Sequence, residues 1–383
     1  MFFFEKKNDL TIIFILIALL GIGGASFLGT KTTNPAPPPS NPPVLSVTPL
    51  ADNNGLQLKT FSPPTATPTP TPPPTTVTIP ITPTGTTPPY SGVLTKLKIQ
   101  GTHLINANGQ QVVLRGASRW SLEFSCGDGH FNLSDFQAMA SWKFTVVRFP
   151  LNASRWNGNG CNASQYQALV KQAVRNAEAA GVYPVLVGQW DLPNGDPGYN
   201  PPLGRKSSHY DKMISDLATM FAADPLVMFV PATEPHDVSW NVWKNGDNTY
   251  VGMQWMVDTI NRLAPNHIIF VNGLQWDKDL SFLTNGNAIT GQNIGYEVHP
   301  YGYLSQWQNQ WTQLHNQGYF IWDGELGKDS SGDTTQAQVT LFEAWRTGWA
   351  AWAWNGSELF ANWNPNQRTA LGTLLYTTAI NAH

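Results

Sequence analysis

Two glutamates lie at the ends of apolar segments and could share one reaction. Glu234 lies in MFVPATEP and Glu325 in YFIWDGELG. A carboxyl group beside a buried strand is costly unless it has a partner. Each could instead be an acidic residue in the first turn of a helix. As a pair they suit cleavage of a glycosidic bond with retention, in which a carboxylic acid protonates the leaving oxygen and a carboxylate attacks the anomeric carbon.

Eight short apolar segments alternate with helical patterns, and this order predicts an α/β fold, the closed parallel (β/α)8 TIM barrel. The expected strands are 112–116, 145–150, 183–189, 227–232, 267–271, 294–299, 320–324 and 350–354, and the expected helices include 164–180, 212–221, 253–263 and 336–346. Glu234 then follows strand four and Glu325 strand seven. These strands face each other across the barrel mouth, so the carboxyl groups could meet at the retaining distance of about 5–5.5 Å.

The predicted connections differ in length at the two ends of the barrel. Segments that follow strands are long, and those that lead from a helix to the next strand are short. The long segments are 191–207, 236–248, 328–334 and 355–366. A barrel enzyme builds its site from the loops after its strands. This difference indicates one functional face, the face that carries both glutamates.

Six motifs in order resemble glycoside hydrolase family 5, the cellulase family of the retaining (β/α)8 clan. INANGQQVVLRGAS resembles the family's first strand and VVRFPL its second. TEP stands where the family has Asn-Glu-Pro, and HPY matches His-x-Tyr on strand six. GELG matches the nucleophile strand, and WAWN the aromatic on strand eight. The resemblance runs from residue 97 to the end, about three-quarters of the chain.

The resemblance implies roles for five residues. Glu234 corresponds to the acid/base and Glu325 to the nucleophile. Arg148 corresponds to the arginine that steadies the nucleophile, because a nearby cation favours a carboxylate. Tyr301 corresponds to its hydrogen-bonding tyrosine, and His299 to the histidine near the acid/base. Strand alternation places His299 and Tyr301 on one face. Arg148 could also form a structural ion pair, and His299 could be a core residue.

The same resemblance implies a sugar platform and exposes two departures. Trp354 corresponds to the aromatic that stacks on a sugar ring. Thr233 replaces the family asparagine that contacts the sugar 2-hydroxyl. The strand-three histidine is missing, and Gln189 or Trp190 stands in its place. These departures leave the substrate and subfamily open.

The expected function is a retaining, endo-acting β-glycanase on β-1,4-glucan. A β-mannanase or another β-glycosidase of the family is the nearest alternative. A different class, a surface polysaccharide-binding protein with impaired turnover, is supported by Thr233 and opposed by the intact set of Glu234, Glu325, Arg148 and Tyr301. The sequence shows no metal-ligand cluster, P-loop or dinucleotide motif, so we expect no cofactor and no metal site.

Composition excludes some partners. The 383-residue chain has a net charge of -3, which gives no strong field for nucleic acid.

Cys126 and Cys161 are too few for a disulfide scaffold. They fall in the loops after strands one and two, where an exported protein could bridge them; free thiols are the alternative. Tryptophans after the strands could line a cleft or pack in the core, and these are Trp120, Trp190, Trp240, Trp243 and Trp276.

The chain divides into three predicted regions. Residues 1–31 contain an apolar run, 10–28, preceded by Lys6 and Lys7, which fits a signal anchor or a cleaved signal peptide. Residues 32–91 are rich in proline and threonine and predict a disordered linker. Residues 92–383 form the catalytic domain. We therefore expect an extracellular monomer that is membrane-anchored by the N-terminal segment alone or secreted after its cleavage.

Overall fold

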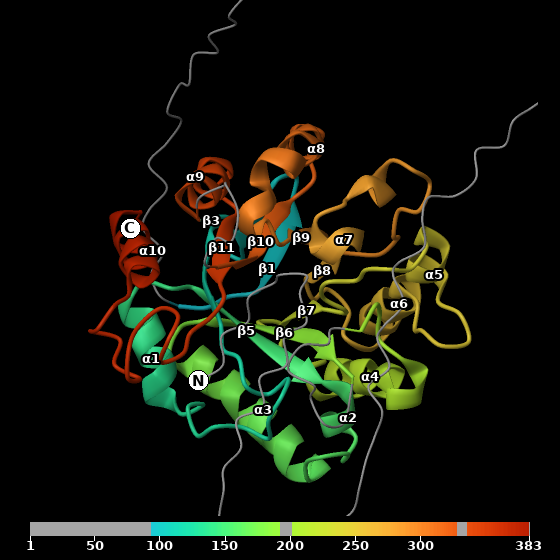
Figure 1. Ribbon diagram of the computed structural model, residues 1–383, viewed down its shortest axis with the longest axis horizontal. Coiled ribbons are helices and arrows are strands. Elements are labelled where there is room, and N and C mark those ends of the chain that lie inside the picture. Colours follow the sequence, from blue (N-terminus) through green and yellow to red (C-terminus); the bar gives the residue numbers. More distant parts are fainter. Residues whose placement is uncertain (1–92, 192–200, 328–334, 383) are drawn as a thin grey trace, which may run out of the picture. The chain divides into compact units, whose positions relative to one another are not determined.

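The computed structural model describes residues 93–191, 201–327 and 335–382. Eight parallel strands close into a barrel in the order β10-β11-β4-β5-β6-β7-β8-β9, and helices lie outside the strands (Figure 1). The strands are β4 (Leu114–Ser118), β5 (Val146–Asn152), β6 (Tyr183–Trp190), β7 (Met228–Val230), β8 (Ile269–Asn272), β9 (Ile294–Val298), β10 (Ile321–Leu326) and β11 (Gly348–Ala351). Each of the eight predicted strands overlaps one of these, so the predicted barrel is confirmed.

The strands are mostly apolar because both of their faces are buried. In β6, Val185 and Val187 point into the barrel, whereas Leu186 points outward against the helices. The barrel interior is therefore a packed core. Polar side chains enter it near the strand ends, with Arg148 in β5 and Glu297 in β9 as two fully buried examples.

Ten α-helices are present in the described part of the chain. They are α1 (Leu133–Ser141), α2 (Ala153–Trp156), α3 (Ala163–Ala179), α4 (Tyr210–Met220), α5 (Trp240–Asn245), α6 (Met253–Leu263), α7 (Leu274–Asp277), α8 (Leu304–Asn316), α9 (Thr335–Trp345) and α10 (Ala370–Asn381). The four predicted helices correspond to α3, α4, α6 and α9. Caps set some of the boundaries: Asn162 accepts a backbone hydrogen bond at the start of α3, and Gly181 takes a positive φ of 82° just after its end.

A small antiparallel sheet precedes the barrel and was not predicted. It contains β1 (Leu97–Gln100), β2 (His103–Asn106) and β3 (Gln111–Val112). Leu97 and Leu104 belong to the same apolar cluster as the barrel interior. The backbone N–H of Ile99 donates to Asn293 at the start of β9, at 2.8 Å. The sheet thus closes the end of the barrel from which the strands begin.

The predicted anchor, 1–31, and the predicted linker, 32–91, lie outside the described residues. Among the helices that the structure does describe, none combines the length and apolar character needed to cross a membrane. Two of the long predicted loops, 191–207 and 328–334, fall partly or wholly outside the described residues.

Candidate active site

The two glutamates singled out in the sequence lie together at the end of the barrel where the strands finish. Glu325 is in β10, and Glu234 follows β7. One carboxylate oxygen of each residue lies within 4.8 Å of the other. This separation is close to the retaining spacing and well short of the roughly 6.5–9.5 Å that leaves room for a water in inverting enzymes. The two side chains differ in exposure, at 15% for Glu234 and 4% for Glu325.

Glu325 is held by two donors, both of which were predicted. The guanidinium of Arg148 donates from Nη1 to Oε1 of Glu325 at 2.7 Å. The hydroxyl of Tyr301 donates to Oε2 at 3.0 Å. Both carboxylate oxygens therefore receive a hydrogen bond, which stabilises the charged form and fixes the direction of the side chain.

Arg148 is fully buried and binds a second carboxylate that the sequence analysis missed. Its Nη1 also donates to Ser118, and its Nη2 donates to Glu297 at 2.8 Å. Burial alone would lower the pKa of Arg148, but the carboxylates of Glu297 and Glu325 outweigh it and hold that pKa above its ordinary value. Burial would likewise raise the pKa of Glu297, but Arg148 and His299 bring it below its usual range. The buried pair of Arg148 and Glu297 is therefore ionised.

His299 lies among four carboxyl groups. Its Nδ1 is 3.3 Å from Glu234 and 3.6 Å from Glu325. Its Nε2 is 3.1 Å from Glu297 and 3.3 Å from Asp277. Burial lowers the pKa of His299, but the surrounding carboxylates raise it well above its usual value. This raised pKa favours the imidazolium form, in which both nitrogens can donate.

The hydroxyl of Thr233 is already bonded within the protein and is not available to a sugar. It is 4% exposed, and its hydroxyl donates to Asp277 at 3.0 Å. Asp277 also accepts from the amide of Asn272 at 2.6 Å. Burial raises the pKa of Asp277 to about 7, and the charges of Glu234 and Glu297 act in the same direction. Thr233 is therefore a supporting residue of this arrangement.

Gln189 and Trp190 occupy the end of β6, where the family histidine is missing. Alternation with Val185 and Val187 directs Gln189 into the barrel mouth. It is 7% exposed, and its Oε1 has no hydrogen-bond partner among the described residues. Trp190 is half-buried and lies against Phe124, with ring centroids 6.1 Å apart. Gln189 can thus offer an acceptor to a bound ligand.

The prediction that Trp354 is a sugar platform is wrong. Its side chain is 1% exposed and packs edge-on against Trp142 and Phe360, with ring centroids 4.9 and 4.7 Å away. Trp352 is half-buried instead, and its ring lies 6.3 Å from that of Trp120. Strand β11 ends at Ala351, so alternation along a strand no longer decides which tryptophan faces the mouth.

The other tryptophans also separate into two groups. Trp243 is fully buried and donates to the carbonyl of Asn272, so it is a core residue. Trp240 packs on it, with ring centroids 5.1 Å apart. Trp120 and Trp276 are half-buried, and Trp276 stacks on His236, two residues after Glu234. An aromatic surface therefore remains at the mouth, but it is smaller than predicted.

Several functional candidates were missed, and only some carried a signal. Glu297 precedes His299 by two residues, so strand alternation could have placed both on one face. Asn272 directly follows a predicted strand and could have been assigned to the rim. Asp277 lies in an irregular segment with no periodicity. Glu123, whose pKa is raised to about 8 by burial, carried no signal either.

Cys126 and Cys161 form a disulfide, with Cα atoms 5.7 Å apart. It joins the loop after β4 to the segment between α2 and α3. Arg155 lies beside it, with Nη1 3.3 Å from the sulfur of Cys161, and donates from Nη2 to the carbonyl of Phe124 at 2.7 Å. The bridge thus braces the loop that carries Trp120.

Two groups of three potential metal ligands share His299. They are Glu234, His299 and Glu325, and Asp277, Glu297 and His299. A protonated imidazole cannot bind a metal, because both nitrogens carry hydrogens. Arg148 already supplies a cation to Glu297 and Glu325. In the structure these side chains form a network of ion pairs with Arg148 and His299.

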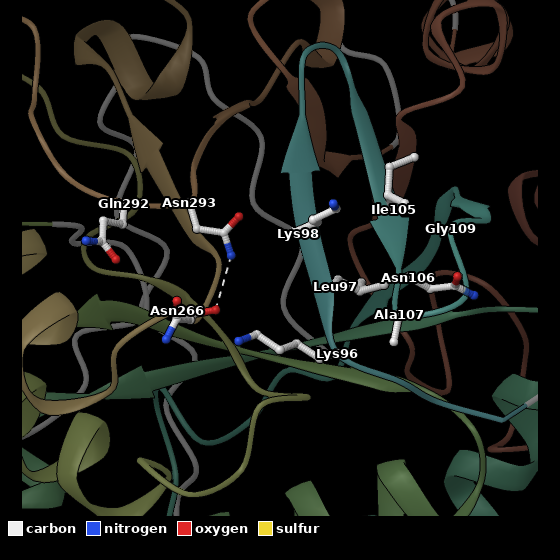
Figure 2. Close-up of a pocket in the computed structure, with 10 residues that line it drawn as sticks. All are labelled: Lys96, Leu97, Lys98, Ile105, Asn106, Ala107, Gly109, Asn266, Gln292 and Asn293. Carbon is white, nitrogen blue, oxygen red and sulfur yellow. Dashed lines mark hydrogen bonds between the residues drawn. The ribbon is translucent and has the colours of Figure 1, made fainter.

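A shallow hollow of about 530 Å³ lies at the opposite end of the barrel (Figure 2). It is formed by β1, β2 and the segments just before β8 and β9. Its polar lining consists of lysines and amides: Lys96, Lys98, Asn106, Asn266, Gln292 and Asn293. The lining of the hollow contains no carboxyl side chain.

Known proteins resemble this chain in both sequence and fold. Endoglucanase MaCel5A of Microbulbifer sp. (strain ALW1) is 25% identical over 289 residues, which are 70% of this chain and 53% of that protein. The chain thus spans about half the length of the curated relatives it matches. The β-glucanase SdGluc5_26A of Saccharophagus degradans, solved with cellotetraose, has a TM-score of 0.63 at 17% identity and covers 76% of this chain and 95% of its own.

A β-mannanase from Streptomyces thermolilacinus, solved with mannohexaose, has a TM-score of 0.57 at 17% identity, covering 74% of this chain and 93% of its own. At these identities the solved structures bear on the fold alone. The family model described as cellulase, glycosyl hydrolase family 5, matches residues 105–358, well over half of the chain. This chain therefore belongs to glycosyl hydrolase family 5, the cellulase family.

Proposed function

We propose that the protein is a retaining, endo-acting glycoside hydrolase of β-linked polysaccharide. The observation that carries this proposal is the pair of Glu234 and Glu325, whose carboxylate oxygens come within 4.8 Å of each other. Their surroundings support different roles. Glu325 is buried with donors on both oxygens, which suits a nucleophile. Glu234 is more exposed and lies beside His299, which suits an acid/base.

The reaction would proceed in two steps. In the first, an oxygen of Glu325 attacks the anomeric carbon, the bond to the leaving oxygen breaks, and Glu234 gives its proton to that oxygen. In the second, Glu234 takes a proton from a water molecule, whose oxygen attacks the same carbon and releases Glu325. Two inversions give net retention. Arg148 and Tyr301 would hold Glu325 in line throughout.

We propose β-1,4-glucan as the substrate, with β-mannan as the alternative. The names of the relatives support both: MaCel5A is an endoglucanase, and one structural neighbour is a β-mannanase. In this chain, Trp352 and Trp120 offer apolar surface at the mouth for the flat face of a sugar ring. Gln189 offers a buried acceptor for a sugar hydroxyl.

We further propose the arrangement of the whole chain. Residues 1–31 would anchor the protein in a membrane or serve as a cleaved signal, and residues 32–91 would be a spacer. The catalytic domain, 92–383, would then act outside the cell as a monomer. The composition of the first two regions supports this arrangement, and fractionation of cells that express the full chain tests it.

The test of activity is release of reducing sugar from β-glucans and β-mannans by the wild type, Glu325→Gln and Glu234→Gln. We expect the Glu325 variant to lose at least about 10⁴-fold in rate, because the nucleophile is removed. Proton NMR of early products should show the β-anomer. An α-anomer as first product would refute the retaining mechanism. Binding of these polymers by a wild type without turnover would instead establish the binding protein that Thr233 first suggested.

A further inference from the structure

Asp277 is fully buried and collects hydrogen bonds from both sides of the site. The backbone N–H of Glu234 lies 2.9 Å from each of its carboxylate oxygens. The hydroxyl of Thr233 and the amide of Asn272 donate to Oδ2 at 3.0 and 2.6 Å. His299 approaches the same oxygen at 3.3 Å.

The backbone of Glu234 needs such support. Its φ is 52°, in the left-handed region that residues with a side chain rarely adopt. Such conformations persist where the surroundings hold them, and they gather at functional sites. The contacts around it include the N–H of Glu234 on Asp277, the ring of His236 at 2.8 Å from the carbonyl of Glu234, and the N–H of Trp276 on the carbonyl of Pro235 at 3.2 Å. The segment around Asp277 therefore holds the peptide unit that precedes Glu234 and the one that follows Pro235.

The contacts of Thr233 belong to the same arrangement. The family motif has asparagine here, and the shorter threonine hydroxyl points to Asp277 rather than to a ligand. Thr233, Glu234 and His299 thus converge on one carboxyl group. His299 in turn contacts the carboxylate of Glu234 from its other nitrogen. Both the backbone and the carboxyl group of Glu234 are therefore connected to Asp277.

We propose that Asp277 is the positioning residue for the acid/base, acting through the Glu234 N–H, Thr233 and His299 without touching the substrate. This inference rests on the proposed function, because it assumes that Glu234 protonates the leaving group. Arg148 and Tyr301 bond directly to Glu325, whereas Asp277 bonds directly to the backbone of Glu234, and His299 lies between the two glutamates. A loss of Asp277 should then impair proton transfer and spare nucleophilic attack.

Leaving groups distinguish these two effects. Cleavage of cellotetraose needs a proton on the departing sugar, whereas 2,4-dinitrophenyl β-cellobioside has a leaving group that departs without one. The quantity to compare is kcat/KM, which reports the first step on each substrate. For Asp277→Asn we expect a loss of about 10² on cellotetraose, since a misplacement of roughly 1 Å costs that much. On the dinitrophenyl substrate we expect a loss below about fivefold.

Three further variants complete the experiment. Thr233→Val removes one donor to Asp277 at similar volume and should give the same pattern with a smaller loss. Thr233→Ser restores the hydroxyl and should recover most of that loss. Asp279→Asn is the matched control, because Asp279 lies two residues further on and its side chain accepts from Ser281 and Gln310, away from Glu234. Its two kcat/KM values should match those of the wild type.

The outcomes separate the possibilities. Equal losses on both substrates in Asp277→Asn and Thr233→Val would overturn the inference, since they would indicate general damage to the site. Wild-type values on both substrates would overturn it as well. If Asp277→Asn does not fold, as judged by circular dichroism, the two Thr233 variants decide the matter. A wild type that cleaves neither substrate would refute the proposed function itself, and the positioning role with it.

Discussion

Removal of the Cys126–Cys161 disulfide should lower stability by an amount that follows from the loop it closes. The cysteines are 35 residues apart in sequence. The chain-entropy relation then gives about -12.7 cal/mol/K, or roughly 3.8 kcal/mol at 25 °C, as the stabilisation from restricting the unfolded chain. For a domain that spans residues 93–382, an unfolding entropy of about 2.1 cal/mol/K per residue converts this to a fall in Tm of roughly 6 °C.

The assay is thermal and urea unfolding of the double variant Cys126→Ser, Cys161→Ser, with Ser125→Ala as a control in the same loop. Wild type treated with a reductant should approach the double variant. Activity at 25 °C should change little, because Arg155 still donates to the carbonyl of Phe124 and holds the loop. A fall in Tm below about 1 °C would refute the loop-entropy argument. A large loss of activity at 25 °C would show that the bridge positions the site.

Three further predictions test the charges and aromatics of the site. Arg148→Lys should lower the free energy of unfolding by about 3 kcal/mol in urea, because an ammonium cannot reach Glu297 and Glu325 as the guanidinium does; an unchanged urea midpoint would contradict it. Burial raises the pKa of Glu123 from 4.5 to about 8, so the folded state holds the extra proton between these values. The contribution of this group to the free energy of unfolding is therefore complete below pH 4.5 and falls by up to about 1.4 kcal/mol per pH unit as pH rises towards 8. Glu123→Gln should remove this pH dependence in urea titrations at pH 5 and 8. Equal pH dependence in the variant and the wild type would count against it. Trp352→Ala, made in the inactive Glu325→Gln background, should weaken cellotetraose binding about tenfold by calorimetry. Trp354→Ala should instead lower the free energy of unfolding by about 3–5 kcal/mol. Equal effects of the two variants would contradict the assignment of the sugar platform to Trp352.

The barrel and its two glutamates could be predicted from the sequence because their signals are local. A strand buried on both faces must be apolar along its length, and eight such segments were recognisable. An acidic residue directly after such a segment lies at the rim, whatever the rest of the chain does. His299 and Tyr301 both lie near Glu325, but β9 ends at Val298, so strand alternation does not explain their placement. The roles of Arg148 and Tyr301 came from resemblance to a family.

Other features depended on which segments meet in space. Trp352 rather than Trp354 reaches the mouth because β11 ends at Ala351, and a strand boundary of that kind depends on pairing with its neighbours. Asp277 contacts Glu234 across 43 residues of sequence, through an irregular segment with no periodicity to read. The sequence by itself determined the strand order and the direction of side chains along each strand. Only closure of the barrel decided which buried charges share a hydrogen bond, because that distance depends on loops and registers that no local pattern encodes.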